Sequence, residues 1–239
     1  MRSKDFLRVD AAIDNHFKNN KKQRDFVDAK RMKLFELGEE LFNSISHGFG
    51  AALSILGLVL MVIKAHGALR ETTVSLFGAT MIVLYTISCV YHALSHNLEG
   101  KKVLRVIDHC NVFLLVYGTY IPISLVGVGG LTGLLLFIGI TVIISTGVTA
   151  TAIKIDKTGA LQVICHLLSG WGILFFLKPL SNTIGTTGIV LLILGGVMYT
   201  IGSILYGIGR KKKYIHSIFH IFCILGTLFH FLCIYITLL

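Results

Sequence analysis

The 239-residue chain is too apolar for a soluble domain, because 54% of its residues are hydrophobic and only 14% are charged, with a mean hydropathy of +0.78. This composition excludes a soluble globular protein and a disordered chain, and it indicates a polytopic membrane protein. The formal net charge is +10, and most of the basic residues lie in an N-terminal tail and short loops, where they set membrane topology. We therefore expect membrane lipids as partners, and no nucleic acid.

Residues 1–40 are polar and mixed in charge, so we expect a cytoplasmic tail ahead of a membrane domain at 41–239. A transmembrane helix needs about 20 apolar residues, and seven suitable runs follow the tail. They are 41–64, 73–96, 107–128, 131–153, 159–177, 185–209 and 214–238. The weakest boundary is "VGVGGLTG" at 126–133, where length argues for a break although no charge is present. The sequence thus predicts an all-α bundle of seven transmembrane helices.

The basic residues also predict the orientation of this bundle. With the N-terminus in the cytoplasm, 19 of the 22 Lys and Arg residues lie on the cytoplasmic side, and only Lys64, Arg70 and Lys178 lie outside. Such an asymmetry follows the positive-inside rule. We therefore expect a multi-pass protein of the cell inner (plasma) membrane, with its N-terminus inside and its C-terminus outside.

Four of the expected helices bring polar and ionisable residues to the same cytoplasmic half of the bilayer. These residues are Glu40, Asn43 and His47; Ser88, His92 and His96; Asp108 and His109; and His216 and His220. Spacings of three or four residues place most of each set on one helix face. At a rise of 1.5 Å per residue, His92 lies about 7 Å and His220 about 9 Å from their helix ends, so their depths match. Ionisable residues inside a membrane usually face the bundle interior and mark function.

Three neutral imidazoles that leave a fourth position open are typical of catalytic zinc. His92 on one helix and His216 and His220 on another would supply the three. Asp108 and Ser88 would then orient a water molecule or a ligand ring. Two other interpretations stay open. Each histidine can simply be hydrogen-bonded inside the bundle, or the His, Asp and Glu residues can form a proton relay.

The remaining histidines receive weaker assignments. A second HxxxH pair makes His96 an alternative ligand, although it lies nearer the headgroups. His109 should point about 100° away from the residue before it on the helix, and we expect it at an interface. His166 is deep enough for a supporting role, whereas His230 lies some 15 Å beyond the proposed ligands of its helix and is too far to bind the same ion.

Four motifs occur in a family order: "EELFNSISHGFG", "SCVYH", "RVIDHCNVFLLVYGTYIP" and "HSIFH". Together they resemble the hemolysin III family, the bacterial branch of the progestin and adipoQ receptors, in a superfamily of seven-helix membrane hydrolases that includes the alkaline ceramidases. The resemblance implies a seven-helix bundle and Zn²⁺ held by His92, His216 and His220. It also implies that Asp108 holds a water molecule on the zinc, with Ser88 beside it.

The family's first motif falls on Glu40, Asn43 and His47, which we place, with His96, as possible supporting residues around the zinc. The residues and the resemblance together predict a zinc-binding integral membrane protein of the hemolysin III type. The first hypothesis for its activity is a zinc-dependent, ceramidase-like hydrolase of lipid amides or esters at the inner leaflet, with Asp108 as base or water-positioning group. A membrane-state sensor or regulator with a structural zinc is one alternative. A pore-forming cytolysin is another, against which the chain shows no secretion signal.

Overall fold

The computed structural model describes residues 21–94, 99–155, 157–209 and 214–239, and these ranges are helical without any strand. The chain separates into two compact units, Met1–Glu40 and Leu41–Leu239. The α-helices are α2 (Lys21–Lys64), α3 (Ala68–Ala93), α4 (Glu99–Pro122), α5 (Gly130–Lys154), α6 (Gly159–Trp171), α7 (Leu177–Gly209) and α8 (Ile215–Thr237). A π-helical turn η1 (Ile123–Val128) follows α4, and a 3₁₀ segment η2 (Gly172–Phe176) follows α6.

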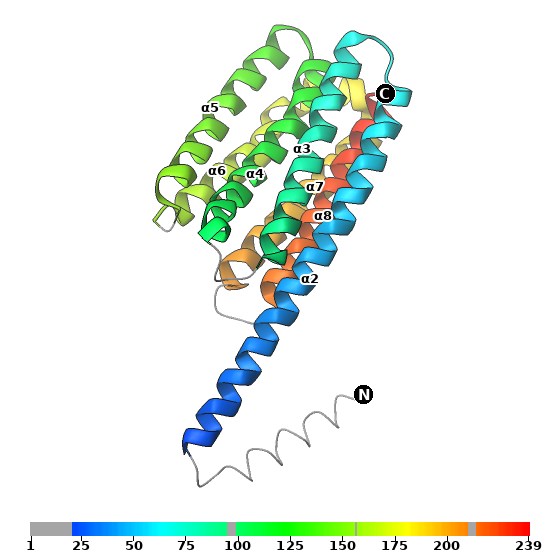
Figure 1. The fold of residues 1–239 in the computed structure, drawn as a ribbon. Coiled ribbons are helices and arrows are strands. Elements are labelled where there is room, and N and C mark those ends of the chain that lie inside the picture. The colour runs from blue at the N-terminus through cyan, green and yellow to red at the C-terminus, as the bar shows by residue number, and fades with distance from the viewer. Residues whose placement is uncertain (1–20, 95–98, 156, 210–213) are drawn as a thin grey trace. The chain divides into compact units, whose positions relative to one another are not determined.

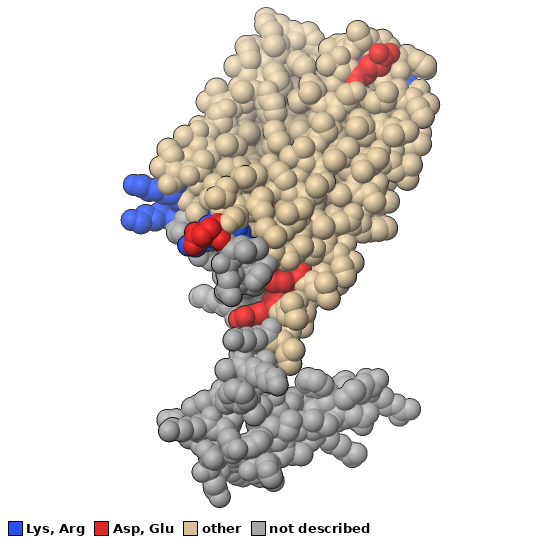
Figure 2. Space-filling model, in the orientation of Figure 1, with Lys and Arg blue, Asp and Glu red and all other residues tan. Residues whose placement is uncertain are grey.

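The outer surface of the second unit is apolar, as a bilayer requires of a spanning protein. Large side chains such as Leu56, Val142 and Phe175 are exposed, and on the face drawn in Figure 2 the charged side chains stay at the margins of the helical bundle. Six helical segments in the described ranges are long and apolar enough to cross a membrane. The protein is therefore an all-α, multi-pass membrane protein.

The predicted break at 126–133 is confirmed, and two glycines make it. Pro122 lacks the N–H that a continuing α-helix needs, and the chain passes from it into the wider turn η1. Gly129 and Gly130 then adopt φ values of 66° and 56°, a left-handed region that glycine enters without a steric penalty. The chain reverses there and starts α5 without any charged residue in the turn.

The apolar segment Gly159–Gly207 contains 49 residues, so as one straight helix it would measure about 74 Å. That length is more than twice the hydrocarbon thickness of about 30 Å. The segment is interrupted at Gly185, whose φ of 61° and ψ of −172° are not helical. Figure 1 accordingly draws α6 beside α5 and α7 beside α8.

Small residues allow the helices of the second unit to approach closely. A Cβ atom built on Gly118 of α4 would lie 2.0 Å from the hydroxyl oxygen of Thr80 on α3, and one on Gly50 of α2 would lie 2.9 Å from the ring of Tyr85. These contacts need glycine, because lipid-embedded helices associate by close packing between small residues. They bring α2, α3 and α4 together around the site described below.

A buried hydrogen-bond network joins α3, α7 and α8. The hydroxyl of Thr227 donates to the Cys223 carbonyl oxygen at 3.0 Å. It lies 2.6 Å from the hydroxyl of Tyr85 and 2.7 Å from that of Tyr199. Since the proton of Thr227 is used on Cys223, its two lone pairs can accept from both tyrosines; the Tyr85 hydroxyl also lies 3.3 Å from the Cys223 carbonyl oxygen. This network fixes α8 against α3 about two turns from His220.

Candidate metal centre

Helix α3 presents two polar side chains to the bundle interior near its C-terminal end. Ser88 is 2% exposed and His92 6% exposed, and their spacing of four residues places them on one face. His220 is on α8 and is 2% exposed. Imidazoles at this burial need polar partners, because a buried polar group without one is costly.

His92, His216 and His220 converge, so the predicted meeting of these side chains is confirmed. One ring nitrogen from each lies within 4.8 Å of the others. The Nε2 atoms of His216 and His220 are 3.1 Å apart, and the ring of His92 lies 4.8 Å from that of His220 and 5.7 Å from that of His216. Three nitrogens on two helices thus face a common point.

His47 of α2 is a fourth member of the cluster. Its Nε2 atom lies 2.5 Å from Nδ1 of His220, and the two rings have centroids 3.9 Å apart. It is 4% exposed and makes an edge contact with Tyr85 at 5.1 Å. Helix α2 is held beside α3 by a hydrogen bond from the Ser44 hydroxyl to the Cys89 carbonyl. The sequence assigned His47 only a possible supporting role, and the spacing contains no signal for this direct contact.

A cavity of about 90 Å³ opens beside the cluster. Ser88 and Asp108, the two side chains predicted to orient water, both line it together with His47, His216 and His220. The Asp108 side chain is 14% exposed. The cavity therefore combines imidazole nitrogens, a hydroxyl and a carboxylate within mostly apolar walls.

The expectation that His109 lies at an interface is wrong. Its side chain is only 19% exposed and lines the same cavity as Asp108. Its Nδ1 atom is 2.8 Å from the Arg105 carbonyl oxygen and its Nε2 atom is 3.0 Å from the Tyr206 hydroxyl. The wall that α7 forms here turns the ring inward, and Tyr206, which the sequence did not single out, becomes part of the cavity lining.

The other predicted supporting residues have separate outcomes. Asn43 is 1% exposed, and its side-chain oxygen has no hydrogen-bond partner among the described residues. Glu40 belongs to the Met1–Glu40 unit. His96 lies outside the described residues. The structure therefore adds His47 to the cluster. Supporting roles for Glu40, Asn43 and His96 remain predictions.

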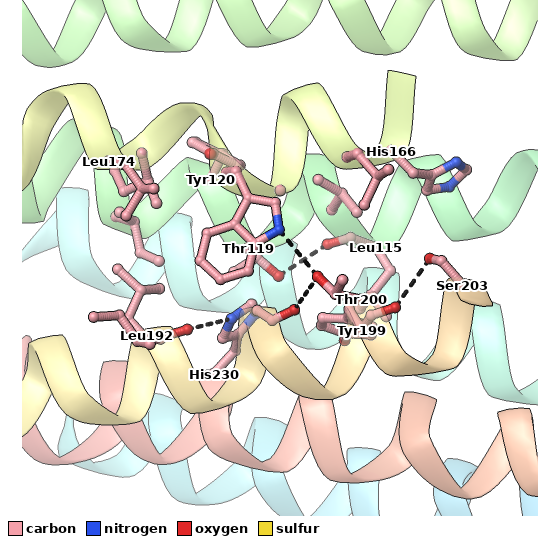
Figure 3. Close-up of a pocket in the computed structure, with 18 of the residues that line it drawn as sticks. Leu115, Thr119, Tyr120, His166, Leu174, Leu192, Tyr199, Thr200, Ser203 and His230 are labelled. Atoms are coloured by element: carbon pink, nitrogen blue, oxygen red, sulfur yellow. Dashed lines mark hydrogen bonds between the residues drawn. The ribbon is translucent and has the colours of Figure 1, made fainter. Parts of the chain in front are cut away.

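A second cavity, of about 80 Å³, adjoins the first between α4, α6, α7 and α8 (Figure 3). Its walls are largely apolar, and His166 lines both cavities. His230 lines only the second one. A Cβ atom on Gly195 would lie 2.2 Å from the His230 ring, so this glycine makes room for it.

The donor set fits a transition metal ion such as zinc. Imidazole is a preferred zinc ligand, and three histidines with a free side match catalytic rather than closed structural sites. His220 has one nitrogen toward His216 and the other toward His47. A histidine that binds a metal through one nitrogen commonly donates its other N–H to a polar neighbour, which is the arrangement found here.

The fold and cluster define a class: an α-helical, multi-pass membrane protein with a buried histidine cluster that opens to a cavity. The family model described as "Haemolysin-III related" matches residues 35–231. A protein named hemolysin-3 homolog from Bacillus subtilis (strain 168) is 32% identical over 204 residues, covering 84% of this chain and 95% of that protein. Hemolysin-3 from Bacillus cereus is 31% identical over 207 residues, covering 85% and 93%. The chain belongs to the hemolysin III family and is a multi-pass protein of the cell membrane.

Proposed function

We propose that the protein is a zinc-dependent hydrolase of lipid amides or esters, with zinc bound by His92, His216 and His220. The observation that carries the proposal is the convergence of these three nitrogens within 4.8 Å. Two of the rings, those of His216 and His220, line a cavity that is also lined by Asp108 and Ser88. A site of purely structural zinc is usually closed by four protein ligands. A cavity with a carboxylate beside three ligands favours chemistry.

When bound, zinc would supply a Lewis acid that activates water and polarises the substrate carbonyl. The residues of the chain perform the remaining steps. Asp108 accepts a proton from the attacking water as general base and returns it to the leaving amine or alcohol. Ser88 lines the same cavity, where its hydroxyl would hydrogen-bond the water or the substrate. Water is consumed, the carbonyl–nitrogen or carbonyl–oxygen bond breaks, and a carboxylic acid and an amine or alcohol leave.

The two adjoining cavities indicate how a lipid would bind. The reacting carbonyl would lie in the cavity beside the histidines, and an apolar chain would extend into the second cavity. Leu115, Phe219 and Cys223 line both, so a chain can pass between them without leaving apolar surroundings. Burial of its methylene groups against these walls would contribute about 0.8 kcal/mol each.

The topology completes the proposal. We infer seven spans, because Gly185 divides the 49-residue segment into two pieces that are each long enough to cross. With an odd number of spans and the basic loops inside, residues 1–40 form a cytoplasmic tail and the C-terminus lies outside. The site then faces the inner leaflet, from which a lipid can enter laterally. Reaction of cysteines placed in single loops with an impermeant thiol reagent tests each assignment.

Metal content is the first test. Purified wild-type protein should contain close to one zinc per chain, and His92→Ala and the double variant His216→Ala/His220→Ala should each contain far less. His66→Ala is the matched control, because His66 is an exposed histidine. Equal zinc in all four proteins would overturn the ligand assignment.

Turnover is the second test. Asp108→Asn keeps the shape of the carboxylate but removes the base, so it should retain zinc and lose at least about 100-fold in hydrolysis rate. The lipids extracted from cells that express wild type or Asp108→Asn are compared first. The hydrolysis rate is then measured with purified protein on each lipid whose amount differs. The same lipid profile and turnover in both would refute the hydrolase.

A sensor or regulator of membrane state is the second candidate, and the contact between His47 and His220 favours it. The histidine cluster joins α2, α3 and α8, so zinc binding would hold three helices in one arrangement. In that case zinc removal would change stability or signalling without any turnover to lose. A cytolysin is a further alternative, since the two Bacillus relatives carry the name hemolysin-3, and release of haemoglobin by the purified protein tests it.

A further inference from the structure

Nearly all polar groups that line the second cavity have partners within the protein. Trp171 donates its indole N–H to the Thr200 hydroxyl at 3.0 Å, and Thr200 donates to the Gly196 carbonyl. The hydroxyl of Ser203 donates to the Tyr199 carbonyl at 2.9 Å. Figure 3 shows these bonds running along the wall. The indole and hydroxyls named here therefore have no proton left to donate to a ligand.

Two buried nitrogens are the exceptions. Nε2 of His166 and Nδ1 of His230 are inaccessible to solvent and have no hydrogen-bond partner among the described residues. Both rings line the cavity, one from α6 and the other from α8 (Figure 3). Because an unsatisfied buried polar atom is costly and uncommon, each of these nitrogens needs a partner from outside the described residues, a water molecule or a ligand.

The other nitrogen of each ring identifies what that partner must be. Nδ1 of His166 lies 2.8 Å from the Gln162 carbonyl oxygen, and Nε2 of His230 lies 3.3 Å from the Leu192 carbonyl oxygen. A carbonyl oxygen only accepts, so these nitrogens carry the protons. In neutral imidazoles the two remaining nitrogens are then acceptors. They require a ligand that donates, and they do not suit a ketone, ester or ether.

We propose that the second cavity is a recognition site for an apolar lipid chain that carries a hydroxyl group, which donates to His166 or His230. Apolar walls suit the chain, and the membrane supplies such chains. His166 lies where the two cavities adjoin, so a hydroxyl nearer the reacting carbonyl meets His166 and one further along meets His230. The inference deepens the proposed function by naming the substrate class, and in that respect rests on it.

The only tryptophan of the chain, Trp171, lines the cavity and serves as the reporter. In wild-type protein held in lipid nanodiscs, dibromooctadecanoic acid should quench its fluorescence, because bromine quenches on contact. The competitors are octadecanoic acid, a series of octadecanoic acids that each carry one hydroxyl at a different chain position, and the corresponding methoxy acids. The best hydroxyl isomer should displace the brominated chain about tenfold better than octadecanoic acid. Its methoxy counterpart, which accepts but cannot donate, should show no advantage.

Variants assign the effect to the histidines. The double variant His166→Phe/His230→Phe keeps ring volume but removes both acceptors, so it should bind octadecanoic acid as wild type does and lose the hydroxyl advantage. If the double variant fails to fold, His166→Phe and His230→Phe are measured separately. His166→Phe should lose the advantage of hydroxyls nearer the carboxyl end, and His230→Phe that of hydroxyls further along the chain. His66→Phe, an exposed change, should keep the advantage. Equal displacement by plain and hydroxylated chains in wild type would refute the site, and so would a preference that survives both substitutions.

This binding assay needs no turnover, so its failure is distinct from failure of the hydrolase. A hydroxyl preference without any hydrolysis supports the recognition site and counts against the catalytic proposal. Hydrolysis of plain and hydroxylated lipids at equal rates, with equal binding, refutes the recognition site alone.

Discussion

Replacing His47 tests whether this residue holds His220, the proposed metal ligand, in place. If Nε2 of His220 binds zinc beside His216, its Nδ1 carries the proton and donates to His47, which lies 2.5 Å away. His47→Ala removes that acceptor and frees the ring of His220 to rotate. Loss of such an outer partner typically weakens metal affinity 10–100-fold, which corresponds to about 1.4–2.8 kcal/mol.

Zinc affinity is measured by competition with a chromophoric chelator on apo-protein in detergent. His47→Ala should bind one zinc per chain at saturation but with a dissociation constant raised by about 10–100-fold. His47→Gln, which can still accept a hydrogen bond, should recover part of the loss. Ile45→Ala is the control, because Ile45 lies on the same helix with 64% of its surface exposed. An affinity for His47→Ala within twofold of wild type would refute the positioning role.

Three further predictions concern stability. Gly118→Val should lower the free energy of unfolding by about 2 kcal/mol, seen in denaturant titration, because even its Cβ would lie 2.0 Å from the Thr80 hydroxyl; an unchanged midpoint would contradict this packing. Thr227→Val should cost about 1–3 kcal/mol in the same titration, since Tyr85 and Tyr199 lose their shared acceptor. Chelation of zinc should lower the melting temperature of wild type but not of the variant His216→Ala/His220→Ala.

The part of the site that depends on spacing along single helices could be predicted from the sequence. Rise per residue fixes depth, and repeats of four residues fix a common face, so His92 and the pair on α8 were expected to meet. The contact between His47 and His220 was not predictable in this way. It depends on how α2 rotates about its axis when it packs on α3, and that rotation is set by contacts such as the one at Gly50.

The fold shows the same division. Composition and length predict an apolar helical protein and the break near Gly129, because a run of twice the span length must turn. The surroundings of His109 were predicted wrongly, since the angle between neighbouring residues on a helix does not say which surrounding helices cover each side. In the structure Tyr206 of α7 covers that side and accepts or donates a hydrogen bond there.

The cluster joins residues that are synthesised far apart in time. His47 and His220 are separated by 173 positions, which a ribosome elongating at about 5–20 residues per second needs roughly 9–35 s to cover. During that interval α2 and α3 must wait in the bilayer with buried imidazoles and without the residues of α8. We expect an insertase or early lipid contacts to protect these groups. An ion that bound before α8 is made would be held by His92 without His216 and His220. The centre is therefore assembled only when α8 enters the membrane.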